Sequence, residues 1–198
     1  MKRSIAAAMI AAGLLSTGSS QAASITYATS LSGAAESPAN ASPGSGFATV
    51  IIDTVLQSMD VEVSFSALLG TTTASHIHCC TTVPGVGTAG VATQTPTFSN
   101  FPLGVTSGTY SHVFDLTLSS TWNIAFISAN GGTPAGAEAA LLNGLANGAA
   151  YLNLHTTAFP SGEIRGFLAP VASPEPASLA ILAMGLLGVG VLRRRSAT

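Results

Sequence analysis

Three of the four histidines in this 198-residue chain fall in two short segments that favour β-strands, residues 75–78 and 151–155. Side chains two residues apart in a strand project from the same face, so His76 and His78 present two imidazoles side by side. A third imidazole from a neighbouring strand would complete a site for copper or zinc, because imidazole suits both metals. His155 is the expected third ligand.

A structural role explains the same three residues equally well. Each histidine could cap a strand end, hydrogen-bond the backbone or face solvent, and His-x-His alone is weak evidence for a metal. The fourth histidine, His112, matches no ligand pattern and is expected to be exposed.

Cys79 and Cys80 directly follow the histidine pair. Adjacent cysteines cannot crosslink distant segments within one chain, which leaves a vicinal disulfide, free thiols or metal thiolates. Cys80 has the strand parity of His78, so it is an additional candidate ligand. A thiolate there would favour Cu(I) or zinc.

The segment from Ala158 to Gly166 carries a turn, Pro160-Ser161-Gly162, followed by a strand with Glu163 and Arg165 on one face. Arg165 is expected to pair with an acid, in preference to a role beside a bound anion. The sequence has neither a Gly-x-Ser-x-Gly motif nor a glycine loop for phosphate. We therefore predict no catalytic residues and no enzyme activity.

The elements that position these residues are mostly short strands. Residues 59–65 alternate between apolar and polar side chains, which is typical of a half-buried strand. An apolar stripe after Pro134 predicts one helix, residues 134–146, with Gly148 as its stop. The fold class expected is all-β, an antiparallel Greek-key-like sandwich or barrel with one short helix. The predicted strands are residues 25–31, 47–53, 59–65, 74–79, 108–118, 123–127, 149–155 and 163–168.

The first 22 residues have the pattern of a secretory signal peptide. Lys2 and Arg3 precede an apolar run, and Ser20-Gln21-Ala22 offers small residues for cleavage after Ala22. The chain is therefore expected to be exported, into a compartment where disulfides persist.

Residues 173–198 have the pattern of a membrane tail, with an uncharged run over residues 177–192. As a transmembrane helix this run would be about 24 Å long, slightly short of a hydrocarbon core of about 30 Å. A buried core helix is the less favoured alternative. Pro174-Glu175-Pro176, the apolar run and Arg193-Arg194-Arg195 together resemble a PEP-CTERM sorting signal. That resemblance implies recognition by an exosortase, transient inner-membrane anchoring, and delivery to the cell surface or beyond.

Between these ends lies one domain, residues 23–172, with a marked acidic character. It has one base, Arg165, against seven acids, a net charge of −6, which makes a nucleic-acid partner very unfavourable. The acidic residues are Glu36, Asp53, Asp60, Glu62, Asp115, Glu138 and Glu163.

The domain resembles a CHRD (chordin-type) domain over residues 25–168. The resemblance rests on Ser75-His76-Ile77-His78, Ala150 to Thr156, and above all Gly162-Glu163-Ile164-Arg165-Gly166. It implies an all-β extracellular domain. The His-x-His strand is also similar to the copper-ligand strand of Cu/Zn superoxide dismutases, but a zinc loop and a bridging histidine are not identifiable.

We therefore expect an exported surface or matrix protein with a structural or adhesive role linked to exopolysaccharide or biofilm, contacting a surface polysaccharide. The alternative is a mononuclear copper-binding module with His76, His78, His155 and Cys80 as ligands. A dismutase-like oxidoreductase is the least favoured function.

Overall fold

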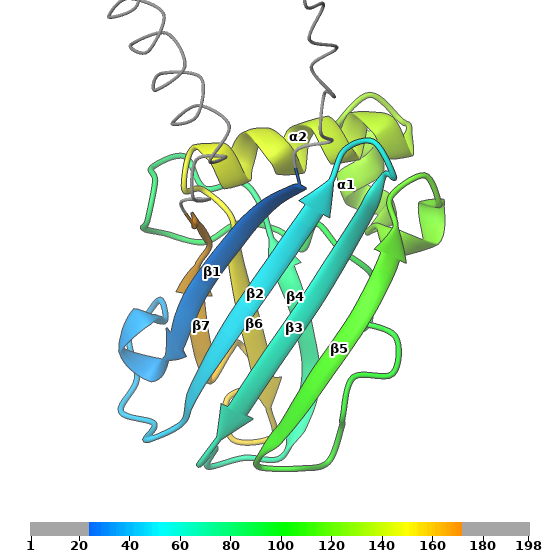
Figure 1. The fold of residues 1–198 in the computed structure, drawn as a ribbon. Helices are drawn as coiled ribbons and strands as arrows, with labels where there is room; N and C mark the ends of the chain where they lie inside the picture. The colour runs from blue at the N-terminus through cyan, green and yellow to red at the C-terminus, as the bar shows by residue number, and fades with distance from the viewer. Residues whose placement is uncertain (1–23, 172–198) are drawn as a thin grey trace, which may run out of the picture.

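The computed structural model describes residues 24–171, so the predicted signal peptide and sorting tail lie outside the described part. Its strands form one antiparallel sheet that curls into a half-barrel, which confirms the predicted fold class (Figure 1). Along the sheet the order is β4-β6-β7-β1-β2-β3-β5, with β8 paired to β1. The strands are β1 (Ser24–Ser32), β2 (Ser45–Asp53), β3 (Ser58–Ser66), β4 (Thr72–His78), β5 (Gly108–Asp115), β6 (Tyr151–Thr156), β7 (Ile164–Phe167) and β8 (Ala169–Pro170).

The front strands in Figure 1, β1, β2, β3 and β5, bury one face and expose the other. On β3, Met59, Val61 and Val63 are buried, whereas Glu62 and Ser64 are exposed. This is the alternation that the sequence predicts, and it places the core inside the curl of the sheet.

Helix α2 (Pro134–Ala146) has the predicted bounds and closes one end of the half-barrel. At the start of the helix, the Thr133 side chain accepts a hydrogen bond from the Gly136 amide. The helix residues Leu141 and Leu145 are buried against the core. Two short 3₁₀ helices, η1 (Gly33–Ala35) and η2 (Ser119–Thr121), follow β1 and β5.

The predicted strand over residues 123–127 is wrong, because these residues enter helix α1 (Ile124–Ala129). The Asn123 side chain accepts a hydrogen bond from the Ala125 amide at 3.0 Å and so caps the helix. Strand β5 also ends at Asp115, before the predicted Leu118. The Asp115 carboxylate accepts hydrogen bonds from the Thr117 amide and hydroxyl, which turns the chain there.

Strands β4 and β6 are buried on both faces. Ile77, Leu152 and Leu154 point into the core. The loop of residues 79–107 returns along β4 through hydrogen bonds such as Phe98 N–H to the Ser75 carbonyl, 3.1 Å. Loop carbonyls also contact the histidines on the outer face of these two strands, so loops cover that face as well.

The two described chain ends lie beside each other. The Val171 amide donates to the Thr26 carbonyl at 2.8 Å, and Ser24 pairs with Asp53. Both ends therefore leave the domain beside the β2–β3 turn and helix α2 (Figure 1). Within residues 24–171, no helix combines the length and apolar character needed to span a bilayer.

Candidate metal centre

The register of β4 against β6 brings the three predicted histidines together. His76 lies opposite Asn153, and His155 lies opposite Ala74, so all three imidazoles share the outer face of one strand pair. One ring nitrogen from each histidine lies within 4.8 Å of the other two. The ring centroids are 5.3 to 5.9 Å apart. The grouping of His76, His78 and His155 is as the sequence predicts.

Each imidazole is held by a backbone carbonyl from a loop. His76 Nε2 contacts the Pro96 carbonyl at 2.7 Å, and His78 Nδ1 contacts the Ala89 carbonyl at 2.9 Å. His155 Nδ1 contacts the Pro160 carbonyl at 2.9 Å. A carbonyl only accepts, so these ring nitrogens carry the protons, and the opposite nitrogen of each neutral ring keeps a free lone pair.

Those opposite nitrogens are the ones left without partners. His76 Nδ1, His78 Nε2 and His155 Nε2 are buried and have no hydrogen-bond partner among the described residues. Buried polar atoms are normally satisfied, so three free lone pairs in one cluster are suited to accept a shared ligand such as a metal ion. An ion about 2.1 Å from each nitrogen would hold them roughly 3.5 Å apart, so the rings need to draw together by about 1 Å. The residues present fit a copper or zinc ion.

The electrostatics keep these rings neutral. Burial lowers the pKa of His76 and of His78 to about 4, and His155 contributes to the lowering of both. Burial also lowers the pKa of His155. A metal ion binds the neutral imidazole, so at neutral pH the site requires no deprotonation before binding.

Two further residues on the same face support His78. The Tyr151 ring stacks on His78, and the Arg165 guanidinium lies over Tyr151, 4.7 Å from its centroid. Arg165 Nε lies 3.8 Å from a Glu36 carboxylate oxygen and donates to the Ala35 carbonyl. Burial raises the pKa of Glu36 to about 7, although Arg165 opposes the shift.

The predicted pairing of Arg165 with an acid holds, but the acid is Glu36 rather than its strand neighbour Glu163. Strand β7 begins at Ile164, so Glu163 lies before the strand and turns elsewhere. Its fully buried carboxylate accepts hydrogen bonds from the loops around it, and so joins three segments of the chain. The donors are the Ser42 hydroxyl, the Thr156 hydroxyl and the amides of Leu69 and Gly70.

The prediction of Cys80 as a ligand is wrong in this structure. Cys79 and Cys80 form a vicinal disulfide, so neither sulfur is a thiolate. The disulfide packs on Gly144 of α2, where an added Cβ would lie 2.5 Å from Cys80 Sγ. The sulfurs thus belong to the contact with α2, and the candidate ligand set is three histidines.

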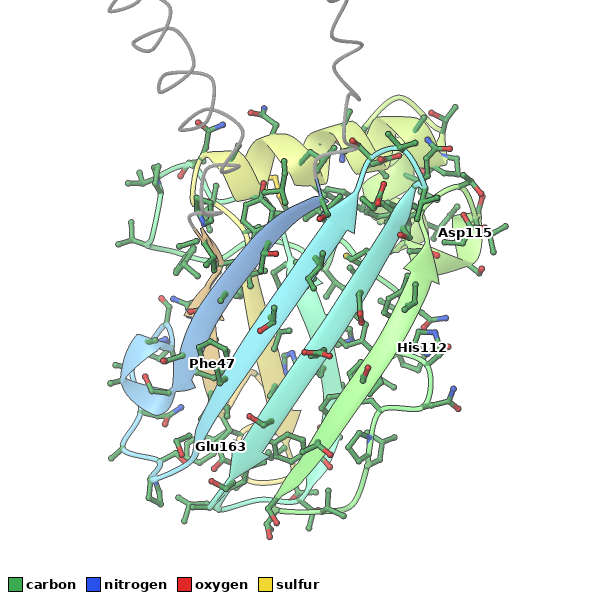
Figure 2. All side chains as sticks on the ribbon, in the orientation of Figure 1. Phe47, His112, Asp115 and Glu163 are labelled. Carbon is green, nitrogen blue, oxygen red and sulfur yellow. A yellow bond between two sulfur atoms is a disulfide. The ribbon has the colours of Figure 1, made fainter. Side chains whose placement is uncertain are left out.

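The sequence did not identify the supporting partners. The carbonyls of Ala89, Pro96 and Pro160 come from irregular loops, which strand periodicity cannot place. Tyr151 has the strand parity of His155, but its stacking on His78 has no sequence signal. The fourth histidine, His112, lies on β5 against Phe114, with ring centroids 4.5 Å apart, and is half-buried rather than exposed (Figure 2).

Comparison with known protein families gave two matches. The CHRD domain family matches residues 27–168, which include all three clustered histidines, and the PEP-CTERM protein-sorting motif matches residues 174–195. No curated protein and no solved structure gave a significant match. The sorting motif is that of an exported protein that an exosortase recognises at the membrane. The chain thus belongs to the CHRD domain family, as an exported member sorted through its PEP-CTERM motif.

Proposed function

We propose that this CHRD domain binds one metal ion, copper in preference to zinc, through His76 Nδ1, His78 Nε2 and His155 Nε2. The observation that carries the proposal is the convergence of three imidazoles, each of which has a buried ring nitrogen without a partner among residues 24–171. The other ring nitrogen of each histidine donates to a backbone carbonyl, which is how proteins orient metal-binding histidines.

The preference for copper rests on the ligand chemistry. Imidazole binds both metals, but copper(II) forms the more stable complexes with nitrogen ligands. The metal would join β4 to β6 and hold the turn that carries Pro160. We assign the site to binding and not to catalysis. A dismutase-like activity would require a redox-active metal first, so metal binding is tested before it.

The experiment is metal analysis and copper titration of a protein comprising residues 23–173, with three single-histidine variants. We expect one copper per wild-type domain, with nitrogen hyperfine structure in its electron paramagnetic resonance spectrum. His76→Ala and His155→Ala should bind much more weakly, by more than the 10–100-fold typical of losing an outer hydrogen-bond partner.

His112→Ala is the matched control, because His112 is the one histidine outside the cluster. It should bind copper like the wild type. Equal stoichiometry and affinity in all four proteins would exclude the site. Zinc competition in the same samples decides between the two metals.

We also propose a structural or adhesive role at the cell surface, in contact with a polysaccharide linked to exopolysaccharide or biofilm. The supporting observation is the open face of β2, β3 and β5, where Phe47 is 49% exposed beside a cleft of about 360 Å³ (Figure 2). Hydroxyl and carboxylate groups surround this ring, and an aromatic ring among hydrogen-bonding groups suits a sugar. Residues lining the cleft include Thr49, Glu62, Ser64, Thr109 and Ser111.

This role is tested in cells. Deletion of the gene should reduce aggregation and retained surface polymer, and the wild-type gene should restore both. A Phe47→Ser gene should restore them poorly, whereas His112→Ala should restore them fully. Unchanged aggregation after deletion, across growth conditions that produce surface polymer, would contradict the proposal.

A further inference from the structure

The turn between β2 and β3, residues 54–57, is unusually apolar for an exposed turn. Val55 is 68% exposed and Leu56 is 76% exposed, and the value for Leu56 is the largest among the exposed large hydrophobic residues of the described part. Turns of this kind normally carry Gly, Asn, Asp or Ser. Two branched apolar side chains at the tip therefore need a reason other than turn formation.

Hydrogen bonds fix the backbone of this turn, with the two apolar side chains exposed. The Asp53 carboxylate accepts hydrogen bonds from the Val55 amide at 2.9 Å and the Leu56 amide at 2.8 Å. On the far side of the turn, the Gln57 carbonyl accepts from the Leu116 amide at 2.8 Å. The tip is thus fixed at both ends and cannot easily fold its apolar groups inward.

The same end of the domain has further exposed apolar side chains. Ile124 at the start of α1 is 71% exposed, and Leu118 and Val171 are about half exposed. Figure 1 shows the β2–β3 turn, both helices and both described chain ends gathered at this end of the sheet. Only uncharged and acidic residues accompany them, since Arg165 is the one base in residues 24–171 and is buried.

The sorting motif begins at residue 174, three residues after Val171. The apolar run expected to enter the bilayer begins at residue 177, six residues after Val171, and six residues span about 20 Å even when fully extended, so this end of the domain stays near the bilayer that the tail engages. We infer that the apolar tip, Val55 and Leu56, inserts into the surface of an uncharged or zwitterionic lipid bilayer while the tail is attached. The inference is independent of the proposed metal site.

The test uses the exported chain with its tail, reconstituted into phosphatidylcholine nanodiscs with and without brominated acyl chains. The single native tryptophan, Trp122, is 4% exposed and contributes a constant signal. In Leu56→Trp the added emission should shift to the blue and lose about half its intensity in brominated lipid, as expected for insertion of 5–10 Å.

Phe47→Trp is the matched control, because Phe47 is an exposed apolar residue about 20 Å along β2 from its end at Asp53. Its emission should be the same in both lipids. Equal, weak quenching of the two variants would overturn the inference. A blue shift of Leu56→Trp without quenching by bromine would also overturn it, because another part of the protein would then cover the tip.

Discussion

His78 lies flat against Tyr151, with ring centroids 4.8 Å apart and ring planes 6° from parallel. The Tyr151 hydroxyl is 3.1 Å from the Ala89 amide and 3.3 Å from the Ala89 carbonyl. That carbonyl is also the acceptor for His78 Nδ1. Tyr151 therefore fixes His78 twice, by contact with its ring and by anchoring the loop residue that orients it.

Changing Tyr151 should weaken metal binding without removing a ligand. Tyr151→Leu loses both supports and should weaken copper binding about tenfold or more, as other partners that orient a ligand do. Tyr151→Phe keeps the stacking and should fall between Tyr151→Leu and the wild type. Competition with a chelator of known affinity measures the order. Wild-type affinity in Tyr151→Leu, with an unchanged circular dichroism spectrum, would contradict this role.

The metal-free domain should lose stability in mild acid. The pKa values of His76 and His78 are about 4 in the folded state, against 6.5 ordinarily, so the unfolded chain binds protons that the folded chain does not. Their contribution is complete above pH 6.5 and is lost as the pH falls toward 4. Urea unfolding at pH 7.5 and pH 5 should show this loss.

The double variant His76→Gln/His78→Gln isolates the histidine part of this pH dependence. Glu36 acts in the opposite direction, because its pKa is raised to about 7 and its contribution falls as the pH rises from 4.5 through 7. Glu36 is present in both proteins, so the difference between them reports the histidines. The variant should lose less stability than the wild type between pH 7.5 and pH 5. Equal losses would show that the histidines do not titrate as inferred.

Glu163→Gln should destabilise the domain by about 2–4 kcal/mol, because hydrogen bonds to a buried charge are strong and an amide cannot accept all of them. Burial alone would raise the pKa of Glu163, but the hydrogen bonds from Ser42, Thr156, Leu69 and Gly70 outweigh it and lower the pKa. Urea unfolding at pH 7 measures the loss. Glu62→Gln, on the exposed face of β3, should change stability by less than about 0.5 kcal/mol. Similar values for the two variants would contradict the role given to Glu163.

Gly144→Ala tests the packing of the disulfide on α2. Alanine favours a helix by about 1 kcal/mol over glycine, but its Cβ would overlap both cysteine sulfurs, and such overpacking costs about 1–3 kcal/mol. We expect a net loss in the wild type and a net gain in Cys79→Ala/Cys80→Ala, measured by thermal unfolding. The cysteine variant should bind metal with unchanged stoichiometry. The same effect of Gly144→Ala in both backgrounds would contradict the contact.

The strands and the histidine cluster were predictable because side chains alternate between the two faces of a strand, and this alternation can be read from a few neighbouring residues. The parity of His76 and His78 is a property of one strand, and the position of His155 follows once β6 pairs with β4. Residues 123–127 misled the prediction because Ile124, Phe126 and Ile127 favour strands, whereas the cap from Asn123 favours the helix that forms.

The supporting contacts of the site depend on loops and on distant segments. Arg165 meets Glu36 and Ala35 from the opposite end of the sequence, and the Pro96 carbonyl is placed by a loop with no periodic pattern. The vicinal disulfide was one of three alternatives that the sequence left undecided for Cys79 and Cys80. Only the fold, which places Gly144 against the sulfurs, shows why Cys80 does not face the histidines.

The histidines and the core occupy alternate positions of the same two strands. Ile77 lies between His76 and His78 with its side chain in the core, and Leu154 does the same beside His155. Substitutions at one set of positions therefore leave the other set largely untouched. Descendants of such a domain could lose, keep or exchange these histidines while retaining the same half-barrel, so membership of the family does not by itself establish a metal site in any one member.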